Sequence, residues 1–175
     1  MEVHQAIEIR KSVRSYLSKP VPEDVLTRVL EAGRLSPSAV NHQPWHFIVV
    51  TDPAKRNGMT DGPYAKFLAE SPVVIVGLGD KNKSPKWHVV DTTIALQTMV
   101  LAATEEGLGT CWIGSFYQDS IRKLLNVPDN YVIVAMLAVG YPREKEEGVS
   151  RSPRVKNRKP LADITSFEEF GKKKP

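Results

Sequence analysis

Residues 34–50, RLSPSAVNHQPWHFIVV, decide the fold, because a turn of small and polar residues leads directly into an apolar run. Pro37 and Pro44 prevent a helix from continuing through the turn, since proline lacks a backbone N–H and restricts the residue before it. Residues 45–51 then predict a strand. An ordinary connection between a helix and a strand would carry more Gly, Asp and Lys and less Trp. The hydroxyl and side-chain amides of this turn are therefore candidates for holding a flat ligand with polar edges.

Helices and strands alternate on both sides of this turn. Apolar residues at helical spacing predict helices over residues 3–9, 23–33, 88–106 and 118–125. The segment 53–70 predicts one or two short helices in which Tyr64, Phe67 and Leu68 face inward. Apolar runs predict buried strands over 73–78 and 131–140, and a short strand or turn over 109–116. Gly107 is expected to end the helix before it as a C-cap.

Composition places the chain among ordinary globular domains. It has 175 residues, 41% hydrophobic and 25% charged, with a net charge of +4, which suits one domain or one half of an intertwined dimer. Part of the positive charge lies in Lys172, Lys173 and Lys174, which predict a solvated tail within residues 162–175. The basic residues are not interleaved with aromatics, so no nucleic-acid surface is expected.

Several other classes of site and location are also not expected. The single cysteine, Cys111, excludes an internal disulfide and predicts a small buried hydrophobe, and four histidines form no cluster with metal-ligand spacing. No run of about 18 apolar residues predicts a membrane span. The first residues, MEVHQAIEIRKS, carry charges where a secretion signal has an apolar core, so a cytoplasmic protein is expected.

Two glycines after the strand 73–78 invite a dinucleotide-binding interpretation. Gly77 and Gly79 form a G-x-G pattern, but Asn82 stands where a third glycine is expected. Pro85 would also break the helix that has to begin there. The sequence therefore argues against a nucleotide loop at this position.

The longest predicted helix, residues 88–106, is apolar on nearly every face. Such a helix has to be covered on all sides. The helix could be covered in two ways: by a central position in a monomer, or by an interface between two copies of the chain. We favour the interface. His88 is interpreted as a helix-start residue and not as a catalyst.

The segment RKSVRSY, residues 10–16, allows two interpretations. Basic residues at the end of a helix can simply offset its dipole. Two arginines around a serine also suit a phosphate monoester. The motif resembles the opening motif of the nitroreductase family, the small FMN-dependent homodimeric reductases. In that resemblance Arg10 and Ser12 hold the FMN phosphate, with Lys11 beside them, and Arg14 lies near the pyrimidine edge of the flavin.

Three further segments carry the same resemblance, in the order found in the family. The turn PSAVNHQPW resembles the flavin- and substrate-facing loop. The segment GTCWIGSF, residues 109–116, resembles the stretch whose backbone N–H points at flavin N5, at Ile113 or Gly114. The segment KNRKPL, residues 156–161, reads by composition as a solvated linker and by resemblance as a phosphate clamp. Lys156 and Arg158, spaced by one residue, can lie on one side of an extended backbone.

The resemblance implies an α+β, nitroreductase-like fold with a mixed, mainly antiparallel sheet flanked by helices, in an intertwined homodimer. Two FMN sites would lie between the subunits. One subunit would supply Arg10, Lys11, Ser12, Arg14, Ile113, Gly114, Lys156 and Arg158, and the other would supply Pro37, Ser38, Ala39 and Asn41. Lys66 is a further candidate at the pyrimidine edge. Four aromatic residues are candidates for lining the acceptor pocket: Trp45, Trp112, Tyr64 and Phe116. For the two tryptophans, packing in the core is the better interpretation.

The expected function is hydride transfer from NAD(P)H through FMN to an electron-poor small molecule, such as a nitro compound or quinone, in a ping-pong mechanism. No protein acid or base is required. The chain is shorter than many members of the family, so a lid over the flavin is expected to be small or absent. Three alternatives stay open: a flavin-binding protein with a regulatory or storage role, a relative with another flavin chemistry, and a phosphate-binding dimer without flavin. NADH and NADPH are not distinguished.

Overall fold

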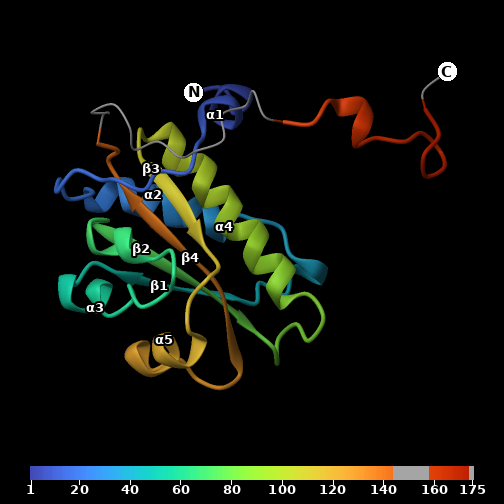
Figure 1. The fold of residues 1–175 in the computed structure, drawn as a ribbon. Helices are drawn as coiled ribbons and strands as arrows, with labels where there is room; N and C mark the ends of the chain where they lie inside the picture. The colour runs from blue at the N-terminus through green and yellow to red at the C-terminus, as the bar shows by residue number, and fades with distance from the viewer. Residues whose placement is uncertain (144–157, 174–175) are drawn as a thin grey trace.

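Strand β2 (Val73–Asp80) lies at the centre of the molecule, and all eight of its residues are buried. In the computed structural model, which describes residues 1–143 and 158–173, the sheet has the strand order β1-β2-β4-β3 (Figure 1). The other strands are β1 (Trp45–Val50), β3 (Gly109–Ile113) and β4 (Tyr131–Gly140). All three strand pairs are antiparallel.

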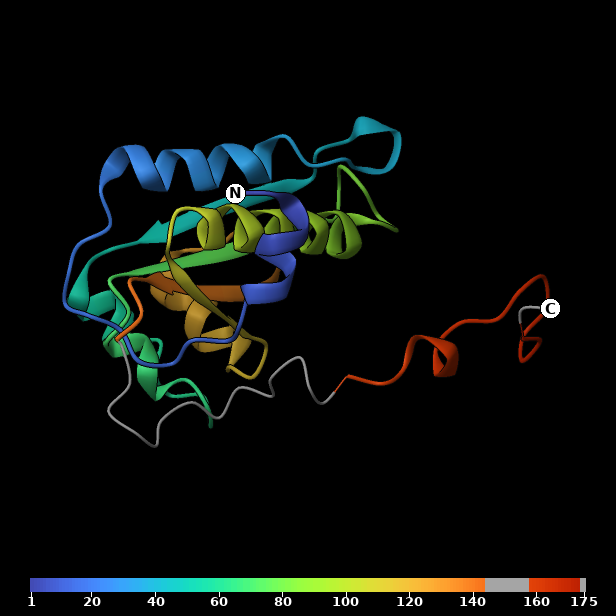
Figure 2. The same cartoon turned by 90° about the horizontal axis from the view of Figure 1, so that it is seen from above.

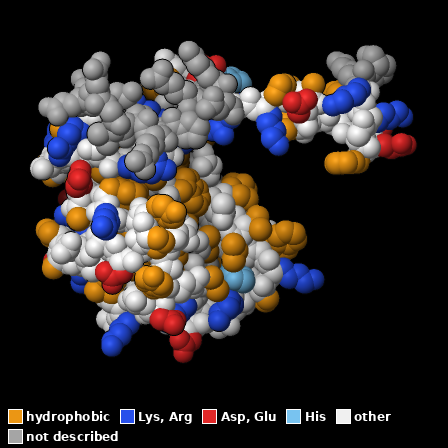
Figure 3. Space-filling model, in the orientation of Figure 1, with side chains coloured by type: hydrophobic (Ala, Val, Ile, Leu, Met, Phe, Trp, Pro, Cys, Tyr) orange, Lys and Arg blue, Asp and Glu red, His pale blue; other side chains and the backbone are white. Residues whose placement is uncertain are grey.

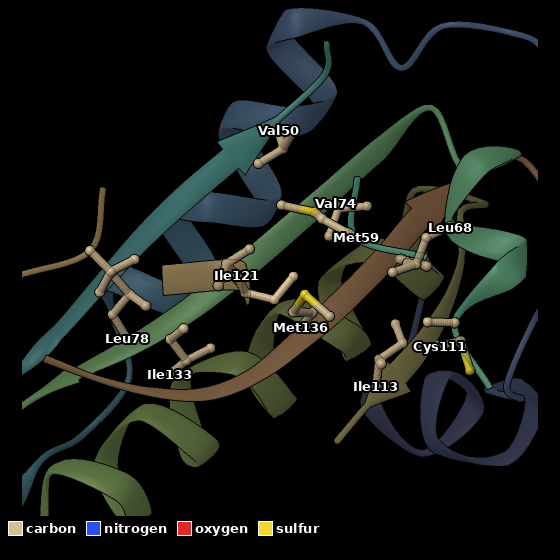
Figure 4. Close-up of a cluster of buried hydrophobic side chains, with 14 of the residues drawn as sticks. Val50, Met59, Leu68, Val74, Leu78, Cys111, Ile113, Ile121, Ile133 and Met136 are labelled. Atoms are coloured by element: carbon tan, nitrogen blue, oxygen red, sulfur yellow. The ribbon is translucent and has the colours of Figure 1, made fainter. Parts of the chain in front are cut away.

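Alternate residues of the central strands fill two separate hydrophobic cores, because successive side chains of a strand point to opposite faces. Val73 and Ile75 of β2 join the core beneath α2 and α4, whereas Val74 and Val76 join the core on the other face (Figure 4). A bulge at Gly77 in the β2–β4 pair shifts the register along β4. The sheet is therefore covered on both faces, as continuous apolar strands require.

Helices form a layer on each side of the sheet (Figure 2). The long helices α2 (Glu23–Arg34) and α4 (His88–Glu105) pack together on one face, and α1 (Val3–Ile9) packs against α4. The other face carries three short helices, which are α3 (Pro53–Asn57), η2 (Lys66–Ala69) and α5 (Gln118–Leu125). Two further 3-10 turns are η1 (Ala39–Asn41) and η4 (Leu161–Asp163).

Most of the predicted elements are confirmed within two residues of their ends, and two details differ. Strand β2 continues past Leu78 to Asp80, because Gly79 pairs with Trp45 at the start of β1. The prediction that Tyr64 faces inward is wrong, since its side chain is 78% exposed. Its neighbour Ala65 fills the core instead, together with Leu68.

Helix α4 is not covered on all sides within one chain. Its buried residues face the sheet and α2, whereas Val89, Val90 and Ile94 are exposed along its outer side. Figure 3 shows hydrophobic side chains gathered on the face that α4 crosses in Figure 1. The described part of the chain therefore leaves one side of this helix uncovered.

The described segment 158–173 extends away from the body in both ribbon views (Figures 1 and 2), and we call it the arm. Lys172 and Lys173 are exposed, as the prediction of a solvated tail requires. The same segment also exposes apolar side chains, at Leu161, Ile164, Phe167 and Phe170. The arm is therefore more than a charged solvated tail.

Candidate functional site

Residues 10–14 lie beside strand β3 at one edge of the sheet. Arg10 is the C-cap of α1, and its N–H donates to the carbonyl of Ala6 at 3.1 Å. Beyond it, Ser12 forms a parallel bridge with Thr110, and the N–H of Val13 donates to the Thr110 carbonyl at 2.8 Å. Two hydrogen-bonded elements therefore fix both ends of this basic segment, which we call the basic half of the site.

No carboxylate of the described residues forms a salt bridge with the cations of the basic half. The salt bridges within residues 1–143 and 158–173 use Arg28, Arg34 and the N-terminal ammonium, and none of them uses Arg10, Lys11 or Arg14. Arg10 is half-buried at its cap position, whereas Lys11 and Arg14 are exposed. Three unpaired positive charges within five residues form a site that attracts an anion.

The thiol of Cys111 lies beneath this basic half. Burial raises the pKa of Cys111, while the positive charge of Arg14 and a hydrogen bond with the Ser12 side chain act in the opposite direction. Buried Cys111 belongs to the core and is a small hydrophobe, as predicted. Ser12 and Arg14 therefore converge on the start of β3.

The end of β3 has an open position at Gly114. Gly114 is exposed, and within the described chain nothing lies within 4 Å of the place where a Cβ would stand. Ile113 before it is 4% exposed and belongs to the core. Of the two predicted N5 contacts, the open surroundings favour Gly114, because a flat ring can approach backbone without a side chain in the way.

The second half of the candidate site is residues 37–43, which we call the turn half. Val40, Asn41 and Gln43 all have positive φ, at 51°, 55° and 48°. This left-handed conformation is uncommon for residues other than glycine, and for a β-branched residue such as Val40 it is an outlier. Hydrogen bonds inside the turn offset part of that strain. The N–H of Gln43 donates to Ser38 Oγ at 2.9 Å, and the N–H of Asn41 donates to the Ser38 carbonyl at 3.0 Å.

The turn half is connected to α4 by Asp91, which sequence reasoning missed. The N–H of Ala39 donates to Asp91 Oδ1 at 3.2 Å. The signal in the sequence is that Asp91 is the single acidic side chain of α4 before Glu105. That pattern marks the residue as unusual but does not say which loop it meets.

The structure does not bring the two halves together within one chain. The turn half precedes β1 and the basic half lies on β3, and these strands are the two outer strands of the sheet. Three strand spacings of about 4.8 Å separate them, or roughly 14 Å across the sheet alone. Pro37, Ser38, Ala39 and Asn41 therefore form one group in the chain, and Arg10, Lys11, Ser12, Arg14, Ile113 and Gly114 form another.

Comparison with known proteins identifies the family of this chain. The model of the nitroreductase family matches residues 7–62 and 55–141. A Methanothermobacter thermautotrophicus protein provisionally named NADH dehydrogenase/NAD(P)H nitroreductase is 35% identical over 151 residues, which cover 82% of this chain and 79% of that protein. The chain belongs to the nitroreductase family.

Solved structures of nitroreductases agree with this assignment. A nitroreductase family protein from Clostridium difficile 630 has a TM-score of 0.85 and 30% identity, covering 97% of this chain and all of that one. An FMN-dependent nitroreductase from Clostridium difficile R20291 has a TM-score of 0.80 and 29% identity, covering 94% and 98%. The predicted α+β nitroreductase-like fold is confirmed, and the names of these relatives support an oxidoreductase.

The remaining predicted site residues of this nitroreductase are less defined. Arg158 is exposed at the start of the arm, and Lys156 lies outside the described residues. Lys66 is exposed and lines an open groove with Asn57, Thr60 and Asp61. Among the aromatic candidates, Tyr64 is exposed, whereas Trp45, Trp112 and Phe116 are half-buried.

Two further features are absent from the described part of the chain. No group of three His, Cys, Asp or Glu side chains within it is placed to hold a metal ion. No helix in residues 1–143 and 158–173 combines the length and the hydropathy needed to cross a lipid bilayer.

Proposed function

We propose that this nitroreductase is an FMN-dependent NAD(P)H oxidoreductase. The observation that carries the proposal is a group of cations, Arg10, Lys11 and Arg14, without a salt bridge in the described chain, fixed at the start of β3, while the other end of the strand leads to the open Gly114. This surface suits a ligand with an anionic end and a flat end. A relative of this fold is named as an FMN-dependent nitroreductase, which supports FMN as that ligand.

The residues present fit FMN. Its phosphate would be held by Arg10, Ser12 and the clamp residues Lys156 and Arg158, and Lys11 adds positive charge beside it. Arg14 would favour negative charge at the pyrimidine edge of the ring system, where Lys66 is a second candidate. The N–H of Gly114, or of Ile113, would donate to the ring, and the loop residues Pro37, Ser38, Ala39 and Asn41 would cover it from a second subunit.

The separation of the two halves supports a homodimer. The turn half is bonded to Asp91 and the N-terminus is bonded to Glu105, 14 residues further along α4. At about 1.5 Å per residue these positions lie roughly 21 Å apart. If two α4 helices pack in antiparallel orientation, the start of each lies near the end of the other, so each turn half approaches the partner's basic half. This packing would bury the exposed Val89, Val90 and Ile94.

The arm supports the same intertwined dimer, because its apolar side chains need a partner surface. Phe170 is fully exposed, and two hydrogen bonds, from the Gly171 N–H to Ser166 Oγ and from the Phe167 N–H to the Lys172 carbonyl, join residues within the arm. We expect Ile164→Asp together with Phe170→Asp to convert a dimer into monomers in sedimentation velocity. Tyr117→Asp, which changes an exposed aromatic residue before α5, should leave the dimer intact.

The proposed reaction uses the chemistry that FMN supplies when bound, which is to accept hydride from NAD(P)H and return electrons to an electron-poor acceptor. The protein contributes binding, orientation and charge, and no acid or base of this chain is assigned a step. Nitro compounds and quinones are the proposed acceptor classes. Because donor and acceptor would share one cleft, we expect parallel double-reciprocal plots, and intersecting plots would contradict the ping-pong scheme. The cytoplasmic location stays a prediction.

The decisive experiment is the absorbance spectrum of the purified protein before and after anaerobic addition of NADH and then NADPH. A yellow protein that either donor bleaches supports the proposal and selects the donor. A yellow protein that neither donor bleaches favours a flavin-binding protein with another role or another flavin chemistry. A colourless protein that does not take up added FMN favours the phosphate-binding dimer and overturns the proposal.

A further inference from the structure

The turn half holds more backbone strain than any other described part of the chain. Three of its seven residues have positive φ, and Val40 combines this with a β-branched side chain that is 88% exposed. Conformations of this kind persist only where surrounding contacts enforce them. The packing of Val40 does not provide that enforcement, because its side chain faces outward.

The contacts that enforce the turn come from two side chains. Ser38 Oγ accepts from the N–H of Gln43, which closes the turn on itself. Asp91 Oδ1 accepts from the N–H of Ala39, which fixes the turn to the first part of α4. The Asp91 bond is the one side-chain hydrogen bond from another element to residues 37–43 in the described chain, so it sets where the turn lies against α4.

Asp91 is an unusual residue for the position that it occupies. Its side chain is 3% exposed, and Oδ2 has no hydrogen-bond partner among the described residues. Burying a carboxylate with one oxygen unsatisfied opposes folding. A dipole interaction with the start of α4 does not require this burial, because Asp119, which also lies in the first turn of its helix α5, is exposed. The contact with Ala39 is the feature that distinguishes Asp91.

We propose that Asp91 is a positioning residue, which holds residues 37–43 in the strained conformation that the proposed FMN site requires. The inference rests on the proposed function for the identity of the ligand, but not for the existence of the tether. Asp91 does not touch the flavin in this scheme. It acts through the backbone of Ala39, and thereby orients Ser38 and Asn41 toward the cofactor of the partner subunit.

Two substitutions of similar size separate the tether from simple packing. Asp91→Asn keeps an accepting oxygen for Ala39 and removes the buried charge. Asp91→Leu fills the same space and has no acceptor. The matched control is Asp119→Leu, which removes a first-turn acidic side chain from a helix that does not touch the turn.

The first measurement needs no flavin. Amide hydrogen exchange of the flavin-free protein should show Ala39 protected in the wild type and in Asp91→Asn. In Asp91→Leu its exchange should be about tenfold faster or more, with α4 amides after Thr92 unchanged. An Ala39 amide equally protected in Asp91→Leu would overturn the proposal. If Asp91→Leu does not fold, Ala39→Pro provides the second variant, because proline removes the donor and suits the first position of a 3-10 turn after extended Ser38. Proline has no amide to exchange, so the readout there is faster exchange of the Asn41 and Gln43 amides, which donate to Ser38.

The second measurement is FMN affinity, by titration of the flavin-free protein. Asp91→Leu, or Ala39→Pro in its place, should weaken binding by about tenfold or more, while Asp91→Asn and Asp119→Leu stay within about threefold of the wild type. If Asp91→Asn lost as much FMN affinity as Asp91→Leu, the charge of Asp91 would matter and its hydrogen bond to Ala39 would not. That result would overturn the proposal. Failure of the wild type itself to bind FMN would refute the proposed function, whereas the exchange result at Ala39 would still decide the tether.

Discussion

Residues 10–14 and residues 37–43 both offer polar groups to one proposed flavin, but the first segment is extended and the second is tightly turned. The basic half follows an ordinary strand-like path, with Ser12 bridged to Thr110, and contributes charges that no carboxylate of the described chain neutralises. The turn half contributes backbone and small side chains in a conformation that is costly to adopt.

The difference teaches that the two halves depend on different physical terms. Affinity in the basic half should depend on charge and on ionic strength, with little effect on stability. In the turn half, affinity should depend little on ionic strength and substitutions should change stability, because the geometry of the turn is set by strain and by hydrogen bonds. Substitutions that change FMN affinity and stability equally in both halves would contradict this distinction.

The largest expected effect comes from the contact that seats the basic half on β3. A Cβ on Gly109 would lie 2.6 Å from Cγ2 of Val13, so Gly109→Val should separate the two segments. We expect a loss of about 3 kcal/mol or more in the free energy of unfolding, as overpacked cores show, together with loss of FMN binding. Denaturant unfolding measures the stability. Gly114→Val is the control, since a Cβ there meets no atom within 4 Å, and an equal loss of stability in both variants would contradict the clash.

A smaller effect is expected from a single charge in the basic half. Arg10→Ala should weaken FMN binding by about tenfold or more, because a hydrogen bond between charged groups contributes about 1.5–3 kcal/mol. The remaining affinity should depend less on salt, while the melting temperature stays nearly constant. Titration of flavin-free protein at two salt concentrations measures this. Lys123→Ala removes an exposed cation of α5 as the control, and an equal loss there would show a general charge effect.

The strain of the turn half predicts a gain in stability. Val40→Asn should stabilise the flavin-free protein by about 1 kcal/mol, because asparagine tolerates the left-handed region that valine does not. For a chain of this size the melting temperature would rise by about 2–4 °C. The control is Leu35→Asn, which makes the same kind of change at an exposed residue with φ of −79°. A gain in the control alone, or a loss in Val40→Asn, would argue against strain at this position.

The sequence predicted those features that local pattern determines. The period of apolar residues located the four strands and the long helices, and Gly107 adopts the positive φ of 73° that a helix end favours. The resemblance selected the basic half and the turn, and the structure groups each of them. The inward orientation of Tyr64 was wrong, because pattern alone does not decide which residue of a short irregular segment fills the core.

Features that depend on distant contacts were beyond the sequence. Nothing local to Val40 signals a positive φ, since a β-branched residue disfavours it. Asp91 stands out in an apolar helix, but its partner Ala39 is 52 residues away along the chain. The distribution of the two halves over opposite edges of the sheet likewise follows from strand order and not from spacing.

The smallest predicted effect uses the pH dependence of stability to test the contact between the basic half and β3. Burial holds the pKa of Cys111 above its ordinary value, so the folded protein binds the thiol proton more tightly than the unfolded chain. This contribution is complete below the unfolded pKa of about 8.5 and is lost as pH rises toward the folded pKa. Arg14 opposes the shift, so Arg14→Gln should raise the Cys111 pKa further and steepen the loss of stability above about pH 9. Urea unfolding between about pH 8 and pH 9.5 measures the slope below the range of tyrosine titration, because burial raises the pKa of Tyr16 and Arg14 lowers it as well. In this range the Cys111→Ala protein should show the same slope with Arg or Gln at position 14. If Arg14→Gln does not change the slope when Cys111 is present, the charge of Arg14 lies too far from the thiol to influence it.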